Sequence, residues 1–107
     1  MSSFDKREEG FEKKYALDEE QKFKAEARRN KLLGLWAAEK LGITGDDAAA
    51  YAKEVVAADF EEAGDQDVQN KVVKDFTAKG VAVTAAEVRI KMDELMAQAV
   101  AQVKAGT

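Results

Sequence analysis

The chain has 107 residues, of which 46% are hydrophobic and 36% are charged, and its formal net charge is −4. It contains no Cys and no His, which excludes disulfides, thiolate chemistry, Cys-ligated zinc and a histidine general base. The negative charge argues against nucleic acid as the main ligand, because such binding depends on neutralising phosphates. The absence of Pro favours helices, so we expect a small all-α domain that is not an enzyme.

Residues 1–17 form a densely charged first segment with few apolar side chains. Phe4, Phe11 and Tyr15 are spaced i, i+7, i+11, so a helix would align them in one narrow stripe. That stripe is too thin to dock firmly on a core, and Gly10 costs a helix about 1 kcal/mol relative to Ala. We expect a mobile N-terminal arm that becomes helical when bound, the alternative being a tail without function.

The chain shows no signal peptide and no membrane-spanning segment. Its longest uncharged run extends from Leu95 to Val103, whereas a transmembrane helix needs about 20 apolar residues. We therefore expect a cytoplasmic protein that does not insert into a membrane.

The next segment predicts a long helix from about Asp18 to Leu41. Acidic residues at 18–20 suit a helix N-terminus, where the dipole favours anions, and Gly42 is a natural C-terminal cap. We assign Trp36 and the leucines around it to the core. The predicted apolar face contains Phe23, Ala27, Leu32, Leu33, Leu35, Trp36, Ala37 and Leu41.

Two shorter helices are predicted to follow. Thr44 is the expected N-cap of the first, which residues 61–64 end, and Asp65 is the expected cap of the second, which Gly80 closes. Tyr51 could serve either the core or a binding site. The two apolar stripes are Ala48, Tyr51, Ala52, Val55, Val56 and Phe60, and Val68, Val72, Val73 and Phe76.

The last helix has the clearest start signal. Thr84-Ala85-Ala86-Glu87 matches the capping box, in which the hydroxyl and the carboxylate each accept a backbone N–H. The predicted architecture is a four-helix bundle over residues 18–107, carrying a flexible N-terminal arm at residues 1–17. The stripe of the last helix is Val88, Met92, Leu95, Met96, Ala99 and Val103.

The densest basic run is Arg28-Arg29-Asn30-Lys31. Guanidinium groups match phosphate oxygens, so the run could hold an anion such as a nucleotide phosphate. The alternative is a solvated helix face, which charged runs on helices usually form.

An acidic cluster surrounds Gly64. It does not fit the ligand register of an EF-hand, and helix capping explains Asp65 and Asp67 directly, so we expect no metal site. No nucleophile lies in a pattern with a base, so we expect no catalytic residues. The cluster consists of Asp59, Glu61, Glu62, Asp65 and Asp67.

Three segments carry a family resemblance: SSFDKREEGFEKKYALDEE at the start, KFKAEARRNKLLGLWAAEKL at residues 22–41 and YAKEVVAADFEEAGDQDV at residues 51–68. Together they resemble the zeta subunit, the ATPase inhibitor of alphaproteobacterial F-type ATP synthases. The resemblance covers nearly the whole chain, although residues 81–107 match more by pattern than by motif.

The resemblance implies a regulatory inhibitor with a four-helix fold. It implies that the arm inserts at a catalytic interface between the alpha and beta subunits, near the gamma stalk, and blocks ATP hydrolysis more than synthesis. The implied partners are thus the alpha, beta and gamma subunits of the catalytic head, with the protein peripheral to the inner membrane and monomeric when free. Carried onto this chain, the contact residues of the arm are Phe4, Arg7, Phe11, Lys14 and Tyr15.

The family is also expected to bind ADP or ATP on its globular part, as a regulatory ligand rather than a cofactor. Its predicted place is the densest basic run: Arg28, Arg29, Asn30 and Lys31. The alternative function is an ADP- or ATP-binding helical sensor without strong inhibitory action, and a third is a generic helical adaptor.

Overall fold

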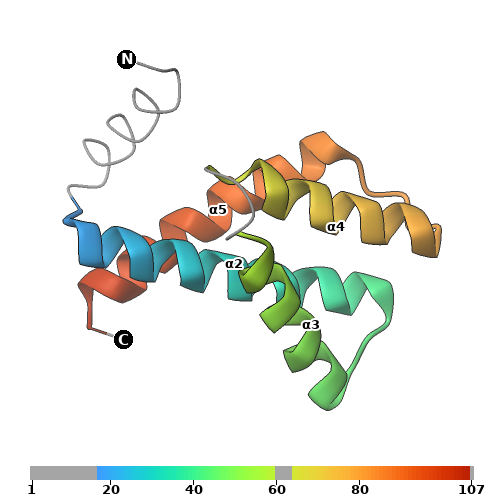
Figure 1. The fold of residues 1–107 in the computed structure, drawn as a ribbon, viewed down its shortest axis with the longest axis horizontal. Helices are drawn as coiled ribbons and strands as arrows, with labels where there is room; N and C mark the ends of the chain where they lie inside the picture. The colour runs from blue at the N-terminus through green and yellow to red at the C-terminus, as the bar shows by residue number, and fades with distance from the viewer. Residues whose placement is uncertain (1–16, 60–63, 107) are drawn as a thin grey trace.

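The computed structural model describes residues 17–59 and 64–106. This part of the chain contains no strand and four helices: α2 (Glu19–Leu41), α3 (Gly45–Ala58), α4 (Gln66–Lys79) and α5 (Ala85–Lys104) (Figure 1). The predicted all-α, four-helix fold is confirmed. The two long helices are the one predicted from about Asp18 to Leu41 and the last one, with 23 residues in α2 and 20 in α5.

α2 is the central helix of the bundle. It packs most extensively against α3 and α5, and α4 contacts all three other helices (Figure 1). Trp36, which the sequence assigned to the core, is half-buried and meets Phe76 edge to face, with ring centroids 5.7 Å apart. The main core draws on all four helices: Leu33, Ala37, Ala38, Leu41, Tyr51, Val55, Val68, Val72, Phe76, Val88 and Met92.

Both predicted glycine stops end their helices in the left-handed conformation, with φ of 77° at Gly42 and 76° at Gly80. Residues with a Cβ rarely adopt this conformation. The next residue then closes a hydrogen bond back into the helix, 2.9 Å from the Val81 nitrogen to the Phe76 oxygen at the second stop. These ends turn the chain sharply and let α2–α3 and α4–α5 pack as neighbours.

The helices start close to the predicted positions, but not every predicted capping hydrogen bond is present. Asp18 and Gln21 form a complete capping box at α2. Thr84 accepts a hydrogen bond from the Glu87 nitrogen at 3.1 Å, as predicted, but the Glu87 carboxylate binds the Thr84 hydroxyl instead of a backbone N–H. Thr44 precedes α3 without making a side-chain capping bond.

The end of α3 differs from the sequence prediction. The helix ends at Ala58 with Asp59 as its cap, before the predicted end at residues 61–64. Phe60, which the prediction placed on the apolar stripe, lies outside the described residues.

Two residues of the predicted apolar face of α2 are exposed. Phe23 keeps 61% of its surface accessible and Leu35 keeps 39%. In the first half of α2 the inward side holds Ala25, and position 23 is about 200° away from it around the helix. The breadth of the apolar pattern therefore overstated how much of this helix is covered.

A second, smaller core secures the start of the bundle. Leu17 is buried at 7% exposure and packs with Ala25 of α2 and with Met96 and Val100 of α5. Leu17, which the prediction included in the arm, therefore packs with the helices.

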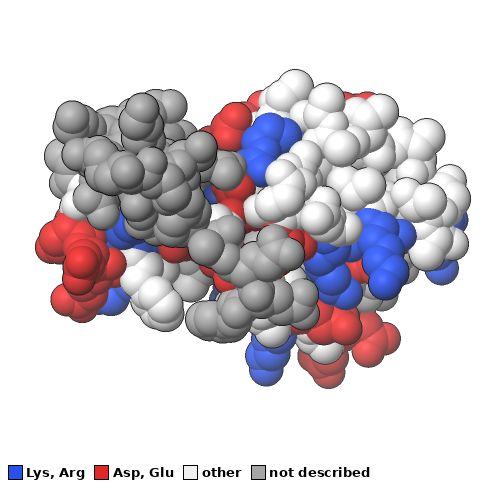
Figure 2. Space-filling view, turned by 45° about the horizontal axis from the view of Figure 1, so that its top comes forward, with Lys and Arg blue, Asp and Glu red and all other residues white. Residues whose placement is uncertain are grey.

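Charged and uncharged surfaces are unevenly distributed. Figure 2 shows a large uncharged area at upper right, over α4 and its connection to α5, with acidic and basic side chains close together elsewhere on that face. Residues 80–86 contain no charged side chain. The mixing of signs agrees with the extensive solvated surface that the composition indicates.

The contact between α2 and α3 generates a stability prediction. A Cβ added at Gly34 would lie 2.6 Å from the Ala52 Cα and 3.3 Å from Val55 Cγ2. We expect Gly34→Ala to lower the free energy of unfolding by about 1–3 kcal/mol through overpacking, although Ala is the better helix former. Urea unfolding of Gly34→Ala and of exposed Lys31→Ala measures this; the control should change by less than about 0.5 kcal/mol. A more stable Gly34→Ala would show that the helices are not in such close contact.

Candidate functional site

The basic run of α2 does not form one surface. Successive helical residues point in different directions, and Arg29 and Asn30 turn inward, at 4% and 0% exposure. Arg28 is half-buried and Lys31 is exposed on the outer side. The structure thus divides the four predicted nucleotide-site residues into an inner pair and an outer pair.

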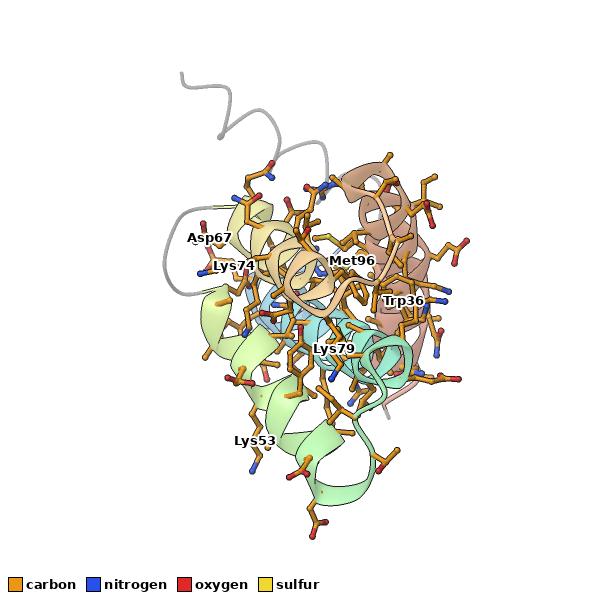
Figure 3. All side chains as sticks on the ribbon, turned by 90° about the vertical axis from the view of Figure 1, so that its right-hand side faces the viewer. Trp36, Lys53, Asp67, Lys74, Lys79 and Met96 are labelled. Atoms are coloured by element: carbon orange, nitrogen blue, oxygen red, sulfur yellow. The ribbon has the colours of Figure 1, made fainter. Side chains whose placement is uncertain are left out.

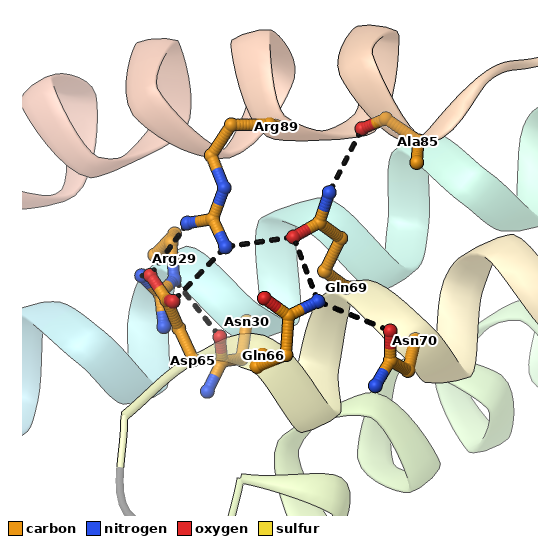
Figure 4. Close-up of polar contacts among 8 residues, drawn as sticks. All are labelled: Arg29, Asn30, Asp65, Gln66, Gln69, Asn70, Ala85 and Arg89. Atoms are coloured by element: carbon orange, nitrogen blue, oxygen red, sulfur yellow. Dashed lines mark hydrogen bonds and ion pairs between the residues drawn. The ribbon is translucent and has the colours of Figure 1, made fainter.

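The inner pair belongs to a network centred on Asp65 (Figure 4). The Asp65 carboxylate lies 3.3 Å from Arg29 Nη1, and it accepts two hydrogen bonds from Arg89, at 2.8 and 3.1 Å. Arg89 also donates to the Gln69 side chain at 2.8 Å. One carboxylate therefore joins α2, the start of α4 and α5.

The electrostatics of the network follow from burial. Removal from water lowers the pKa of Arg29, and the attraction of Asp65 opposes that shift. The hydrogen bond to Asp65 raises the pKa of Arg89. Arginine stays protonated in proteins, so Arg29 is a buried charge that requires its partner.

Asp65 does not act as the side-chain cap that the sequence predicted. Asp65 precedes α4, as expected of a cap, but its side chain makes no capping hydrogen bond. The two arginines occupy the carboxylate instead. Asp67 lies in the first turn of α4 and is buried at 8% exposure.

The outer pair lines a shallow surface hollow of about 800 Å³, here called the α2 concavity. Lys24, Arg28 and Lys31 place three cations along one side of α2, beside the exposed ring of Phe23. Arg28 Nη1 also lies 3.5 Å from Gln102 Oε1 of α5. The remaining lining residues are Asp18, Glu20, Gln21, Ala27, Val56, Val103 and Gly106.

Tyr51, which the sequence left open, joins α3 to α4. Its hydroxyl donates a hydrogen bond to the Asp75 carboxylate at 2.7 Å, and Lys71 Nζ lies 3.0 Å from Asp75. Burial raises the pKa of Tyr51, and the hydrogen bond to Asp75 raises it further. These contacts account for the Tyr51 hydroxyl as part of the packing between the two helices.

Three further predictions concern a metal site, a membrane span and the N-terminal arm. Residues 17–59 and 64–106 contain no group of three or more carboxylates placed to hold a metal ion. No helix among them is long and apolar enough to cross a membrane. The predicted arm residues Phe4, Arg7, Phe11, Lys14 and Tyr15 lie outside the described residues.

Sequence reasoning missed the Asp65–Arg89 and Arg29–Asp65 pairs. Asp65 and Arg29 are 36 positions apart, and nothing local to either marks the other as a partner. The sequence shows only that Arg29 is a cation in a helix that also carries core residues. A cation on a solvated helix face would give the same pattern.

Comparisons with known proteins give one family. The family model described as ATPase inhibitor subunit zeta matches residues 1–102. A structure solved by solution NMR is 59% identical, with a TM-score of 0.70, over 79% of this chain and 96% of that chain. A search of curated proteins finds no significant match.

The Asp65 network generates the second stability prediction. We expect Asp65→Ala to lower the free energy of unfolding by about 3–5 kcal/mol, because Arg29 would remain buried without the carboxylate that pairs with it directly. The double variant Arg29→Met/Asp65→Leu should recover most of that loss, since no buried charge is then unpaired and Arg89 keeps Gln69. Urea unfolding of the single and double variants, with exposed Asp46→Ala as control, tests this. If the double variant loses as much free energy of unfolding as the two single variants together, Arg29 and Asp65 are not coupled.

Proposed function

The chain belongs to the ATPase inhibitor subunit zeta family, and on that basis we propose that it inhibits ATP hydrolysis by the F-type ATP synthase through its N-terminal arm. The arm, which is the part of residues 1–17 that precedes the buried Leu17, inserts at an interface between the alpha and beta subunits near the gamma stalk. The supporting observation is that the family match extends over residues 1–102, so it includes the arm as well as the four helices. In this proposal the chain is a regulatory subunit, peripheral to the inner membrane through the synthase.

The structure of the helical body suits this role. Leu17 is buried and Asp18 caps α2, so Leu17 is fixed against the helical body. An arm that folds on binding loses conformational entropy, and a fixed starting point reduces how much it must lose. In this proposal Phe4, Phe11 and Tyr15 supply the apolar contacts.

The arm generates the third prediction. ATP hydrolysis by the soluble catalytic head is measured with the full chain and with a chain that starts at Leu17. We expect the shortened chain to keep its helical circular dichroism and its unfolding transition but to lose inhibition, because the body retains both cores. Within the full chain, Phe11→Ala and Tyr15→Ala should each weaken apparent affinity about tenfold, equivalent to roughly 1.4 kcal/mol.

The matched control is Lys74→Ala, an exposed residue of α4 that Figure 3 labels. It should inhibit as the unmodified chain does. Equal inhibition by the full and shortened chains would contradict the arm mechanism and assign inhibition to the helical body.

A second candidate function is the binding of ADP or ATP at the α2 concavity. Arg28 and Lys31, with Lys24, offer cations to the phosphates, and the exposed Phe23 ring offers a surface on which a base can stack. The volume of about 800 Å³ lies within the range of small-molecule sites, roughly 300–1,000 Å³. The inner residues Arg29 and Asn30 would support this surface from behind and not contact the nucleotide.

Nucleotide titration supplies the fourth prediction. We expect Arg28→Ala and Lys31→Ala to raise the dissociation constant for ADP about tenfold each, since each removes a phosphate cation. Removal of residues 1–16 and the control Lys74→Ala should leave it unchanged. Isothermal titration calorimetry provides the measurement, and tolerance of both substitutions would remove the α2 concavity as the site.

A further inference from the structure

Three cations of α2 lie along one stripe of the helix surface. Lys24, Arg28 and Lys31 are separated by four and then three residues, the spacing that aligns side chains on one side of a helix. Phe23 and Ala27 form a second, apolar stripe about 80° away around the helix. Both stripes line the α2 concavity, which therefore has a basic side and an apolar side.

The chain before Leu17 carries the complementary pattern. Asp5, Glu8 and Glu12 are separated by three and then four residues, the reverse of the order in α2, so a helix would align them in an acidic stripe. An apolar stripe would lie about 70° away from it around the same helix. That stripe consists of Phe4, Phe11 and Tyr15, and the basic residues on the opposite side are Lys6, Arg7, Lys13 and Lys14.

The acidic and basic stripes match in register if residues 4–15 run antiparallel to α2. In two antiparallel helices joined by a turn, residues lie level when they are equally far along the chain from the middle of the turn. With Asp18 at the middle, each acidic residue of the stripe lies level with one cation. The pairs are Glu12 with Lys24, Glu8 with Arg28 and Asp5 with Lys31, which lie six, ten and thirteen positions before and after Asp18.

The apolar stripes match in the same arrangement. When two antiparallel helices are viewed from one end, their residues turn in opposite senses, so facing stripes follow the same order from side to side. The apolar stripe of residues 4–15 then lies over Phe23 and Ala27, where Val56 of α3 continues the apolar surface. A parallel arrangement would place the apolar stripe over the cations instead.

The start of the described chain fits such a turn. Leu17 packs with α2 and α5, and Asp18 caps α2 and lines the α2 concavity, so residues 16–18 would connect the two helices. Connections of two to five residues are typical of antiparallel helix pairs. The lengths also agree, because a helix over residues 4–15 is about 18 Å long and the lining residues of α2, from Asp18 to Lys31, extend over about 20 Å.

We propose that the α2 concavity is the docking site for residues 4–15 of the same chain, which lie on it as a helix antiparallel to α2. The three carboxylates pair with the three cations of α2. Phe11 lies level with position 25, between Phe23 and Ala27.

The balance of free energies makes this contact reversible. Exposed ion pairs contribute only about 0.2–1 kcal/mol each, and Gly10 costs the helix about 1 kcal/mol. Lys24 exchanges one exposed partner for another, since Glu20 lies 3.0 Å from it. A contact that covers the concavity about half of the time changes the apparent affinity for ADP by only about twofold. The contact involves this chain alone, so it holds whether or not residues 1–16 inhibit an ATPase.

The test places one spin label on the full, ¹⁵N-labelled chain. The sequence contains no Cys, so Ser3→Cys provides a single attachment point, and position 3 lies level with Leu33, two positions beyond Lys31. We expect the backbone amide signals of Lys31 and its neighbours in α2 to lose intensity several-fold more than those of Lys74 in α4, which does not line the concavity. High salt should reduce this difference, because it screens exposed charges.

A charge exchange tests the register. Asp5→Lys, which leaves residues 17–106 unchanged, should reduce the loss of intensity at position 31 several-fold, and adding Lys31→Asp should restore it. The matched control is Lys14→Glu, which reverses a charge on the opposite side of the acidic stripe and should not reduce the loss. Backbone spectra check that each variant is folded. The proposal fails if position 31 is affected no more than Lys74, if Lys14→Glu acts as Asp5→Lys does, or if folded Asp5→Lys/Lys31→Asp does not recover the contact.

Discussion

A guanidinium that leaves water must keep an opposite charge beside it, and Asp65 supplies that charge to Arg29. The same carboxylate holds Arg89 of α5 in a two-point contact. Because Asp65 immediately precedes α4, this interaction places the first turn of α4 against α2 and α5. Val68, Val72 and Phe76 reach the core from that starting point. The shared carboxylate therefore ties the start of α4 to α2 and α5, and the apolar side chains of the main core hold the rest of the helix.

The features that were predictable from the sequence are those whose causes lie within a few residues. Gly42 and Gly80 end helices because each adopts a backbone conformation that favours glycine. Thr84 starts α5 by accepting a hydrogen bond from a residue three positions later. Helix number, order and approximate length follow from such local signals together with apolar periodicity.

The features that were not predictable depend on contacts between distant parts of the chain. The sequence predicted a polar surface at Arg29 and Asn30. Their burial depends on Asp65, which lies 36 positions after Arg29, and a local pattern cannot show that contact. The sequence placed Phe23 on the apolar face, because the pattern does not show which sides of α2 other helices cover. The four residues of the predicted nucleotide site therefore lie together on α2, but their division into an inner network and an outer surface came only from the fold. The inner residues belong to the network around Asp65, and nucleotide binding by the outer ones stays a prediction.

The burial of Leu17 has a mechanical consequence for a member of the family of ATPase inhibitor subunits zeta. Leu17 packs with Ala25 of α2 and with Met96 and Val100 of α5, and α2 begins two residues after it. A force applied to the chain just before Leu17 would therefore act on this packing contact directly. The load would then pass along the longest helix of the bundle and be shared with α5. Leu17 is thus the residue through which a force on the preceding segment would enter the folded body.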